Sequence, residues 1–217
     1  MKLFAHVGGL TLALSILSFV PEQTRGQGTL QWTVTFDGSP PIAPGTGKYI
    51  PQYFEQDMWF RAIGPVPAEP PYHLARMGGG ITGFPENGTA YLIFGFQDSL
   101  AVTSSSGQRF GLVSVDLAEF STLYNFPRTV QFIGYKPDGT TVMTELTTDG
   151  VIDGTGPLAD FQTFTFDSRF ADLVRVEVPM DTWALDSMVF SQIPEPITVA
   201  LLLTAGLLFW ALRSRKS

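Results

Sequence analysis

The amino-acid sequence predicts an all-β, jelly-roll-like β-sandwich, flanked by an N-terminal signal peptide and a C-terminal transmembrane helix. Three observations lead to this prediction. Apolar residues in the middle of the chain recur at every second position, turn-forming Gly, Pro, Asp and Ser separate the short apolar runs, and a long uncharged run stands near each end. The chain accordingly divides into residues 1–26, 27–192 and 193–217.

The first 26 residues have the layout of a secretory signal peptide. Lys2 precedes a mostly apolar stretch that ends at Val20 and is followed by the polar residues PEQTRGQG. Thr24 and Gly26 place small residues at positions −3 and −1 relative to a cut before Gln27. An uncleaved N-terminal anchor is the alternative, because the apolar run is long for a signal core and no A-x-A box is present.

The central segment is acidic and contains no cysteine. Residues 27–192 carry 18 Asp or Glu against 8 Lys or Arg, which gives a net charge of −10. This sign argues against nucleic acid as a partner, because phosphates attract clustered Lys and Arg. The absence of cysteine from the sequence excludes a disulfide framework, a thiol nucleophile and a thiolate metal site.

Alternation with a period of two predicts the individual strands. It is clearest in three segments, QWTVTFDG, FGLVSVDLAEF and LVRVEVP, each with one apolar face for a core and one polar face for water. The further strand candidates are YIPQYFEQ, MWFRAI, AYLIFGF, FQTFTFD and WALDSMVFS. The sequence therefore predicts nine to eleven strands, with at most one short helical turn near Leu117 to Tyr124.

One hairpin and two long loops connect these strands. Pro137-Asp138-Gly139 separates two strand-like runs in TVQFIGYKPDGTTVMTEL and supplies the positive φ that a tight hairpin turn needs. Residues Ser39 to Tyr49 and Gly64 to Gly80 are rich in Pro and Gly and are predicted to be surface loops. Because β-sandwiches commonly bind ligands through such loops, we expect any ligand to lie beside them.

Two motifs resemble catalytic or cofactor signatures but lack the required context. Gly78, Gly80 and Gly83 fit G-x-G-x-x-G, yet a Pro-rich loop precedes them and FPENG follows, so no helix can begin there to meet a pyrophosphate. We interpret the run as a loop. His73 is the only histidine that remains after the signal peptide is removed, and no G-x-S-x-G elbow accompanies it.

The sequence predicts that the protein is not an enzyme. The alternative is a polysaccharide hydrolase, which needs two carboxylates flanking a glycosidic bond. Glu55 with Asp57, or Asp116 with Glu119, would have to serve as that pair. Among 18 carboxylates such pairs arise by chance, so solvated strand faces and turns are the favoured interpretation.

A bound calcium ion and a glycan are the ligands that the composition allows. Asp37 ends the first predicted strand and Asp186 lies in the last, so the two would meet if the terminal strands paired; no D-x-D-x-D-G loop supports them. No other cofactor is expected. A carbohydrate-binding module would stack sugar rings on exposed aromatic residues, for which the candidates are Tyr49, Tyr53, Trp59 and Tyr72.

The C-terminal segment predicts a membrane-inserted helix. Residues 197–212 are uncharged over 16 positions, which is just short of the roughly 17 to 25 that span a bilayer. Arg213, Arg215 and Lys216 follow at once, and such clusters remain cytoplasmic. The acidic domain is therefore expected outside the cytoplasm, which agrees with an N-terminal export signal. An ordinary single-pass anchor is one interpretation of this tail.

Pro194, Glu195 and Pro196 stand directly before that apolar run. In this order, the Pro-Glu-Pro, the short hydrophobic segment and the basic tip resemble the PEP-CTERM sorting signal of Gram-negative bacteria that produce exopolysaccharide. The resemblance implies an exosortase-type processing enzyme as partner, removal of the tail, and delivery to the cell envelope or extracellular matrix. The segment 27–192 is more loosely similar to the β-sandwich regions that precede such tails, which implies contact with extracellular polysaccharide by analogy of fold alone.

Overall fold

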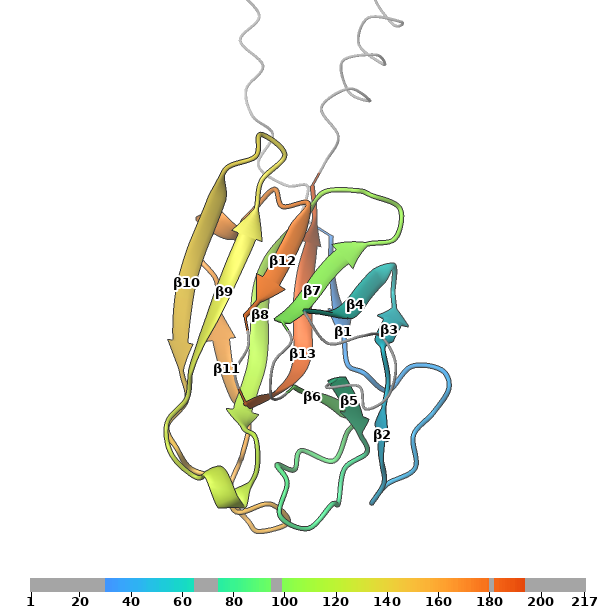
Figure 1. The fold of residues 1–217 in the computed structure, drawn as a ribbon, viewed down its shortest axis with the longest axis vertical. Helices are drawn as coiled ribbons and strands as arrows, with labels where there is room; N and C mark the ends of the chain where they lie inside the picture. The colour runs from blue at the N-terminus through green and yellow to red at the C-terminus, as the bar shows by residue number, and fades with distance from the viewer. Residues whose placement is uncertain (1–29, 65–73, 95–98, 180–181, 194–217) are drawn as a thin grey trace, which may run out of the picture.

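The computed structural model describes residues 30–64, 74–94, 99–179 and 182–193. Within these ranges the chain forms two antiparallel β-sheets that pack face to face around a hydrophobic core (Figure 1). The prediction of an all-β protein with two packed sheets is confirmed. The predicted signal peptide, the Pro-Glu-Pro motif, the C-terminal helix and the basic cluster lie outside the described residues.

The larger sheet has seven strands, in the order β11-β8-β13-β6-β5-β2, and β1 pairs with β13 off this path. These strands are β1 (Gln31–Val34), β2 (Gly47–Tyr49), β5 (Leu74–Met77), β6 (Tyr91–Phe94), β8 (Phe110–Glu119), β11 (Gln162–Thr165) and β13 (Trp183–Gln192). Every pairing is antiparallel.

The smaller sheet has six strands, in the order β10-β9-β12-β7-β4-β3. These strands are β3 (Gln52–Glu55), β4 (Met58–Ile63), β7 (Ser99–Ser104), β9 (Thr129–Tyr135), β10 (Thr141–Thr147) and β12 (Arg175–Val178). Two single-turn 3₁₀ helices complete the described structure: η1 (Thr122–Tyr124) and η2 (Ser168–Phe170). None of the helices in the described ranges is long and apolar enough to cross a membrane.

The main core lies between the sheets and is rich in aromatic side chains. Phe36 meets Phe60 edge to face at 5.0 Å between ring centroids, and Phe110 meets Phe190 in the same way at 5.6 Å. These four rings are at most 1% exposed. Because buried aromatic rings remove the largest apolar areas from water, they contribute much of the energy that holds the two sheets together.

A second, smaller cluster covers the outer face of the seven-stranded sheet. Its buried members are Ala75, Met77, Tyr91, Ile93, Ala118 and Ala184. Residues of the segments that precede β6 and β11, among them Phe84 and Phe161, pack on it. The part of the sheet formed by β5, β6, β8 and β13 is therefore covered on both faces, which explains why no residue of β5 is exposed to water.

A β-bulge in β13 keeps its apolar residues on the core. Before the bulge the odd-numbered residues Trp183 and Leu185 face the core. After it the even-numbered residues Met188 and Phe190 do so. Ser187 has a φ of 46° and lies where the register with β8 shifts. One extra residue thus restores the inward orientation that strict alternation would have reversed.

The predicted hairpin is confirmed as β9 and β10. Tyr135 pairs with Thr141 at its closed end, and the Lys136 N–H donates to the Thr140 carbonyl at 2.9 Å. Gly139 has a φ of 84°, as the turn requires. The Asp138 side chain accepts a hydrogen bond from the Thr140 N–H at 2.9 Å and so stabilises the turn locally.

Several predicted boundaries are wrong. The loop predicted over Gly64 to Gly80 contains β5, whose four residues are all buried because both faces of this sheet are covered. The strand predicted over YIPQYFEQ is interrupted at Pro51, where the chain leaves β2 in one sheet and enters β3 in the other. The predicted helical turn is confined to η1, and β8 continues through Glu119.

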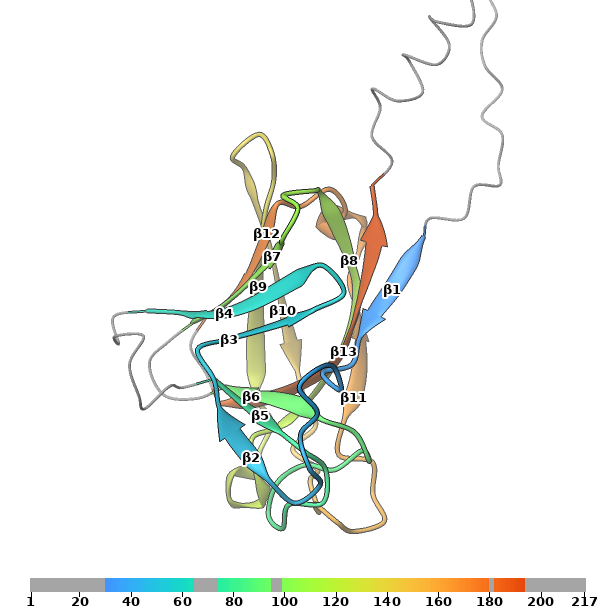
Figure 2. The same ribbon diagram turned by 90° about the vertical axis from the view of Figure 1, so that its right-hand side faces the viewer.

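Both ends of the sandwich domain emerge at the same place. Gln31 pairs with Ser191, and the Gln192 N–H donates to the Leu30 carbonyl at 2.8 Å. We call the end of the sandwich where β1 begins and β13 ends the terminal pole, and the opposite end, which carries η1, the loop pole (Figures 1 and 2).

The core predicts a sharp contrast between two phenylalanines of the neighbouring strands β3 and β4. Phe60 is fully buried, so Phe60→Ala is expected to lower the free energy of unfolding by roughly 3 to 5 kcal/mol. Phe54 is 44% exposed on the other face, so Phe54→Ala is expected to cost less than about 1 kcal/mol. Urea denaturation of the full-length chain in mild detergent measures both, and equal losses would contradict the assigned faces.

Candidate functional site

The two predicted calcium ligands both contact the segment that leads into β6. Asp37, which is exposed, accepts a hydrogen bond at Oδ1 from the Ala90 N–H at 2.9 Å. Asp186 accepts one at Oδ2 from the Thr89 hydroxyl at 2.9 Å. The terminal strands β1 and β13 do pair, and both carboxylates contact residues 89 and 90; that the two carboxylates meet each other stays a prediction.

Asp186 is a buried carboxylate surrounded by hydrogen-bond donors. The residue is 1% exposed, and it also accepts hydrogen bonds from the Asn87 amide at 2.5 Å and the Ser187 N–H at 2.6 Å. Burial raises the pKa of Asp186 to about 6, and the like charge of Asp116, directly opposite on β8, adds to this rise. The hydrogen bonds from its donors lower the pKa but do not offset the burial.

Further acidic groups lie close to Asp186 beneath the same covering loops. Asp160 is 1% exposed and accepts hydrogen bonds from the N–H groups of Glu86 and Asp153 at 2.9 and 2.8 Å, and burial raises its pKa. The buried hydroxyl of Tyr91 has no hydrogen-bond partner among the described residues. Burial and the neighbouring carboxylates raise the pKa of Tyr91. Asp186 thus holds the loop of Asn87 and Thr89 on the sheet through their side chains, and Asp160 joins the covering loops to one another through their N–H groups.

The structure leaves the calcium prediction open. In the described ranges, no group of three or more His, Cys, Asp or Glu is arranged to hold a metal ion. The oxygens of Asp186 and one oxygen of Asp37 already accept hydrogen bonds within the protein. Calcium binding at these two residues stays a prediction.

The predicted sugar-stacking residues separate into two groups. Tyr49 is 63% exposed at the edge strand β2, and Trp59 is half-buried on β4. Tyr53, by contrast, is only 5% exposed, so the prediction that it is an exposed stacking residue is wrong. Tyr72 lies outside the described residues.

Tyr53 turns inward because its neighbour Phe54 takes the outward position of β3. Its ring packs on Phe36 and its hydroxyl donates to Glu55 Oε2 at 2.8 Å and accepts from the Gly38 N–H at 2.9 Å. Burial, followed by the hydrogen bond to Glu55, raises the pKa of Tyr53. The residue therefore fixes the chain after β1, and its largely buried ring lines the pocket described next.

A pocket of about 420 Å³ opens where the loop after β1 meets strands β2 to β5. This volume lies within the range of about 300 to 1,000 Å³ that is typical of small-molecule sites. Ser39 to Ile42 of the predicted loop line it, whereas the last three residues of that predicted loop form β2 instead; a ligand beside this loop stays a prediction. The apolar residues of its wall are Pro40, Pro41, Ile42, Ile50, Phe54 and Trp59.

Arg76 fixes the loop wall of this pocket from β5. Its guanidinium donates to the carbonyls of Phe36 at 2.5 Å, Gly38 at 2.8 Å and Pro40, and it lies 5.0 Å from the centroid of the Tyr53 ring. Arg76 is 5% exposed. Three hydrogen bonds from one rigid, charged group hold this loop more firmly than its Pro-rich sequence alone would suggest.

The first carboxylate pair considered for hydrolysis serves two different segments. Glu55 Oε2 accepts hydrogen bonds from the Phe36 N–H at 2.9 Å and from the Tyr53 hydroxyl. Asp57 lies in the turn between β3 and β4 and accepts hydrogen bonds from the hydroxyls of Ser104, Ser105 and Ser106. These serines lower the pKa of Asp57, Ser105 most strongly.

The second carboxylate pair also makes internal hydrogen bonds. Asp116 accepts a hydrogen bond from the Thr163 hydroxyl at 2.6 Å on the neighbouring strand. Glu119 is 1% exposed and accepts one from the Gly150 N–H at 2.7 Å. The hydrolase alternative stays a prediction that these contacts do not test.

The remaining sequence motifs have structural explanations or lie outside the described residues. The interpretation of Gly78 to Gly83 as a loop is confirmed, because turns and bends, not a helix, follow it up to Ala90. Gly80 and Gly83 have φ values of 80° and 84°. His73 is not among the described residues.

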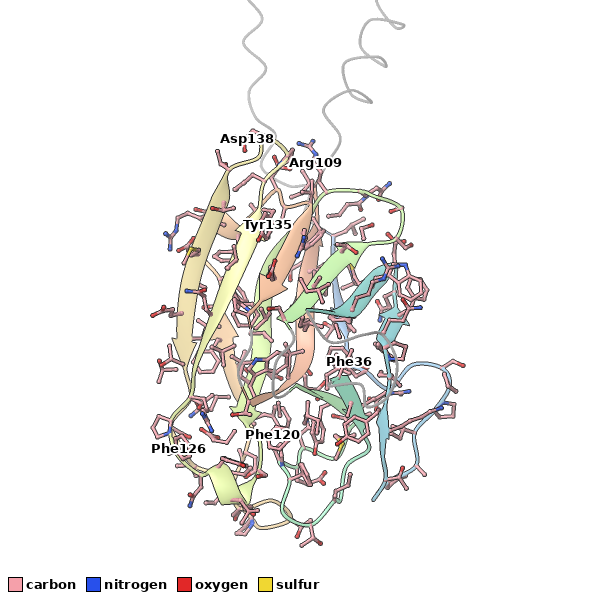
Figure 3. The ribbon with its side chains drawn as sticks, in the orientation of Figure 1. Phe36, Arg109, Phe120, Phe126, Tyr135 and Asp138 are labelled. Carbon is pink, nitrogen blue, oxygen red and sulfur yellow. The ribbon has the colours of Figure 1, made fainter. Side chains whose placement is uncertain are left out.

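The sequence did not predict the aromatic residues of the loop pole. Figure 3 shows Phe120 and Phe126 at this pole, and Arg109 and Asp138 at the terminal pole. Phe126 is 48% exposed and Leu123 in η1 is 86% exposed. Both lie after the last strongly alternating residues of β8, where the period-two pattern no longer indicates which side chains are buried.

Two members of the pocket were also missed, Phe54 and Lys48. The alternation of side chains along a strand predicts that Tyr53 and Phe54 point to opposite faces, but it does not predict which face is buried. Lys48 stands in a segment predicted as a loop, so its neighbours were not predictable.

No protein-family model matches this chain, and no curated protein matches it significantly.

The raised pKa of Asp186 predicts a specific dependence of stability on pH. The pKa of Asp186 in the folded protein is about 6, above the ordinary value of 3.8. The protonated Asp186 side chain therefore makes its full contribution to the free energy of unfolding below about pH 4, and this contribution is lost as the pH rises through 6. Asp186→Asn removes this titration. The stability advantage of wild type over the variant is expected to shrink by about 2 kcal/mol between pH 4 and pH 8 in urea denaturation.

Asp138→Asn at the exposed hairpin turn is the matched control. The hydrogen bonds from Thr140 lower the pKa of Asp138, so its contribution is present above its ordinary pKa and is lost only as the pH falls below it. The difference in the free energy of unfolding between Asp138→Asn and wild type should therefore stay constant between pH 5 and pH 8. A constant difference for Asp186→Asn over the whole range would contradict the burial of that carboxylate.

Proposed function

We propose that this chain is a non-enzymatic β-sandwich protein that is exported and then sorted to the cell envelope or extracellular matrix through its C-terminal segment. The order of Pro194, Glu195 and Pro196, the apolar run and the basic cluster at Arg213, Arg215 and Lys216 supports this proposal. An N-terminal signal peptide and a transmembrane helix near residues 197–212 are parts of it. The inner membrane and an exosortase-type enzyme are the proposed partners during sorting.

The geometric observation that carries the proposal is the pairing of β1 with β13. Both ends of the domain emerge at the terminal pole, so an export signal and a membrane segment can leave from one side while the loop pole faces away. Only Ile193 separates the end of β13 from the Pro-Glu-Pro motif. Two prolines fix φ and remove backbone donors, which keeps such a tripeptide extended and accessible to a protease.

We further propose that the fold is a jelly roll. In one sheet β6, β13, β8 and β11 lie side by side, and in the other β7, β12, β9 and β10 do. From β6 to β13 the chain alternates between the two sheets, with the hairpin β9–β10 as the one exception. This order supports the jelly-roll arrangement of eight strands in two Greek keys.

Intact-mass measurement of the protein from the cell surface or medium of its native host tests the sorting proposal. The expected chain ends within residues 194–196. Replacing Pro194 and Pro196 by Ala should leave the full tail, whereas Thr204→Ala in the apolar run is a control that should be processed normally. A wild-type chain that still ends at Ser217 would contradict processing and favour a permanent anchor.

The second candidate function is a carbohydrate-binding module of an exopolysaccharide or biofilm matrix. The pocket beside Phe54 and Trp59 favours it, because the two rings lie 4.7 Å apart at a surface that sugar rings can reach. Phe54 takes the place that Tyr53 held among the predicted stacking residues. Calcium at Asp37 and Asp186 is a proposal that belongs to this candidate.

A glycan array of the full-length protein in detergent tests this second function. Binding is expected to fall about fivefold or more in Trp59→Ala, since the loss of one stacked ring costs about 1 kcal/mol or more. Leu123→Ala at the loop pole is the control and should bind normally. Calcium binding is tested by the melting temperature, which should be higher in calcium than in chelator for wild type and should not differ between the two for Asp186→Asn. Flat results in both assays would remove the proposal.

A further inference from the structure

The pocket beside Trp59 differs in charge from the rest of the domain. Its lining contains two cations, Lys48 and Arg76, and no Asp or Glu. Residues 27–192 as a whole carry 18 acidic and 8 basic side chains. The only charged residues of the pocket lining are therefore positive, although acidic side chains outnumber basic ones more than twofold in residues 27–192.

The charge of Arg76 is not paired with a carboxylate. All three of its hydrogen bonds go to backbone carbonyls, of Phe36, Gly38 and Pro40, and it makes no ion pair within the described ranges. Carbonyl dipoles solvate a guanidinium but do not cancel its charge, so a positive potential remains at the floor of the pocket. The neighbouring Glu55 bonds to Tyr53 and Phe36 and does not line the pocket.

Lys48 adds a second, movable cation at the edge of the same pocket. It lies on β2 opposite Arg76 on β5, and paired residues of neighbouring strands share a face. The residue is exposed and forms no ion pair with any described residue. Its ammonium can therefore reach a ligand without first breaking an internal bond.

The remaining wall is apolar and partly aromatic. Phe54 is 44% exposed and packs against Trp59, and the Arg61 guanidinium lies 4.6 Å from the centroid of the Trp59 ring. Pro40 and Pro41 stand on the wall that Arg76 holds. A ligand for this pocket thus needs a compact body with an apolar face together with a negative charge.

We propose that this pocket binds an acidic sugar, a uronic acid residue of a polysaccharide, with the ring on Phe54 and Trp59 and the carboxylate toward Lys48. The inference rests on the second proposed function, carbohydrate binding, and narrows its ligand. A pyranose ring offers C–H groups to an aromatic face, and its carboxylate matches the unpaired cations. The domain's net charge of −10 disfavours non-specific contact with an acidic polymer, so binding of such a polymer requires local cations of this kind.

Isothermal titration of the full-length protein in mild detergent with matched trisaccharides tests the inference. The probes are β-1,4-linked glucuronate, galacturonate and mannuronate trimers, each compared with its neutral hexose counterpart. At least one uronate trimer is expected to bind about tenfold more tightly than its neutral partner, and this preference should fall as salt rises.

Three variants separate charge from stacking. Lys48→Gln should reduce uronate affinity about tenfold and leave neutral affinity unchanged, whereas Lys48→Arg should retain the preference. Trp59→Ala should weaken both ligands. Lys136→Gln at the terminal pole is the matched control and should change neither, and an unchanged melting temperature confirms that each variant is folded.

Each alternative outcome has a distinct meaning. If neutral and uronate trimers bind equally and Lys48→Gln affects neither, the inference is overturned while carbohydrate binding stands. If no trimer binds, carbohydrate binding fails together with the inference, although the sorting proposal is untouched. If acetate or citrate competes as strongly as the uronates, the pocket takes small anions and the assignment to sugars is overturned.

Discussion

Strand β13 determines the register of the seven-stranded sheet. β8 pairs along one of its edges, while β6 and β1 share the other, β6 beside Trp183–Leu185 and β1 beside Met188–Ser191. The bulge at Ser187 lies between these two parts. Because apolar side chains on both sides of the bulge must reach the same core, the positions of β1 and β6 relative to one another depend on this single extra residue.

The loops that cover the outer face of β5, β6, β8 and β13 explain why some acidic side chains of this protein are buried. These loops bring backbone N–H groups away from water, and these groups need acceptors. Glu119 and Asp160 supply them from inside the protein, and Asp186 accepts hydrogen bonds from the side chains of Asn87 and Thr89 in one of these loops. The ionised forms of these carboxylates are poorly solvated there, so the covering loops are held at an electrostatic cost that the pKa of Asp186 makes visible.

The sequence predicted those features that depend on local rules. Alternation and turn chemistry located the hairpin around Gly139, the long strand β8 and the two-sheet architecture. It failed where tertiary burial decides: β5 is buried on both faces although it contains Arg76, and the inward position of Tyr53 depends on which side of β3 meets the core. The pocket was predicted only as a loop region, because its cations lie on β2 and β5 of one sheet and Trp59 lies on β4 of the other, so only the packing of the two sheets brings them together.

The position of Gln192 at the end of β13 also determines how the domain responds to force. Any pull transmitted through the residues that follow acts along the axis of β13, whose hydrogen bonds to β8 and β1 lie on both sides of it. Such a load stretches many bonds at once instead of opening them one after another. A domain tethered at this point and held elsewhere along the strand axis is therefore arranged to resist extraction of its last strand.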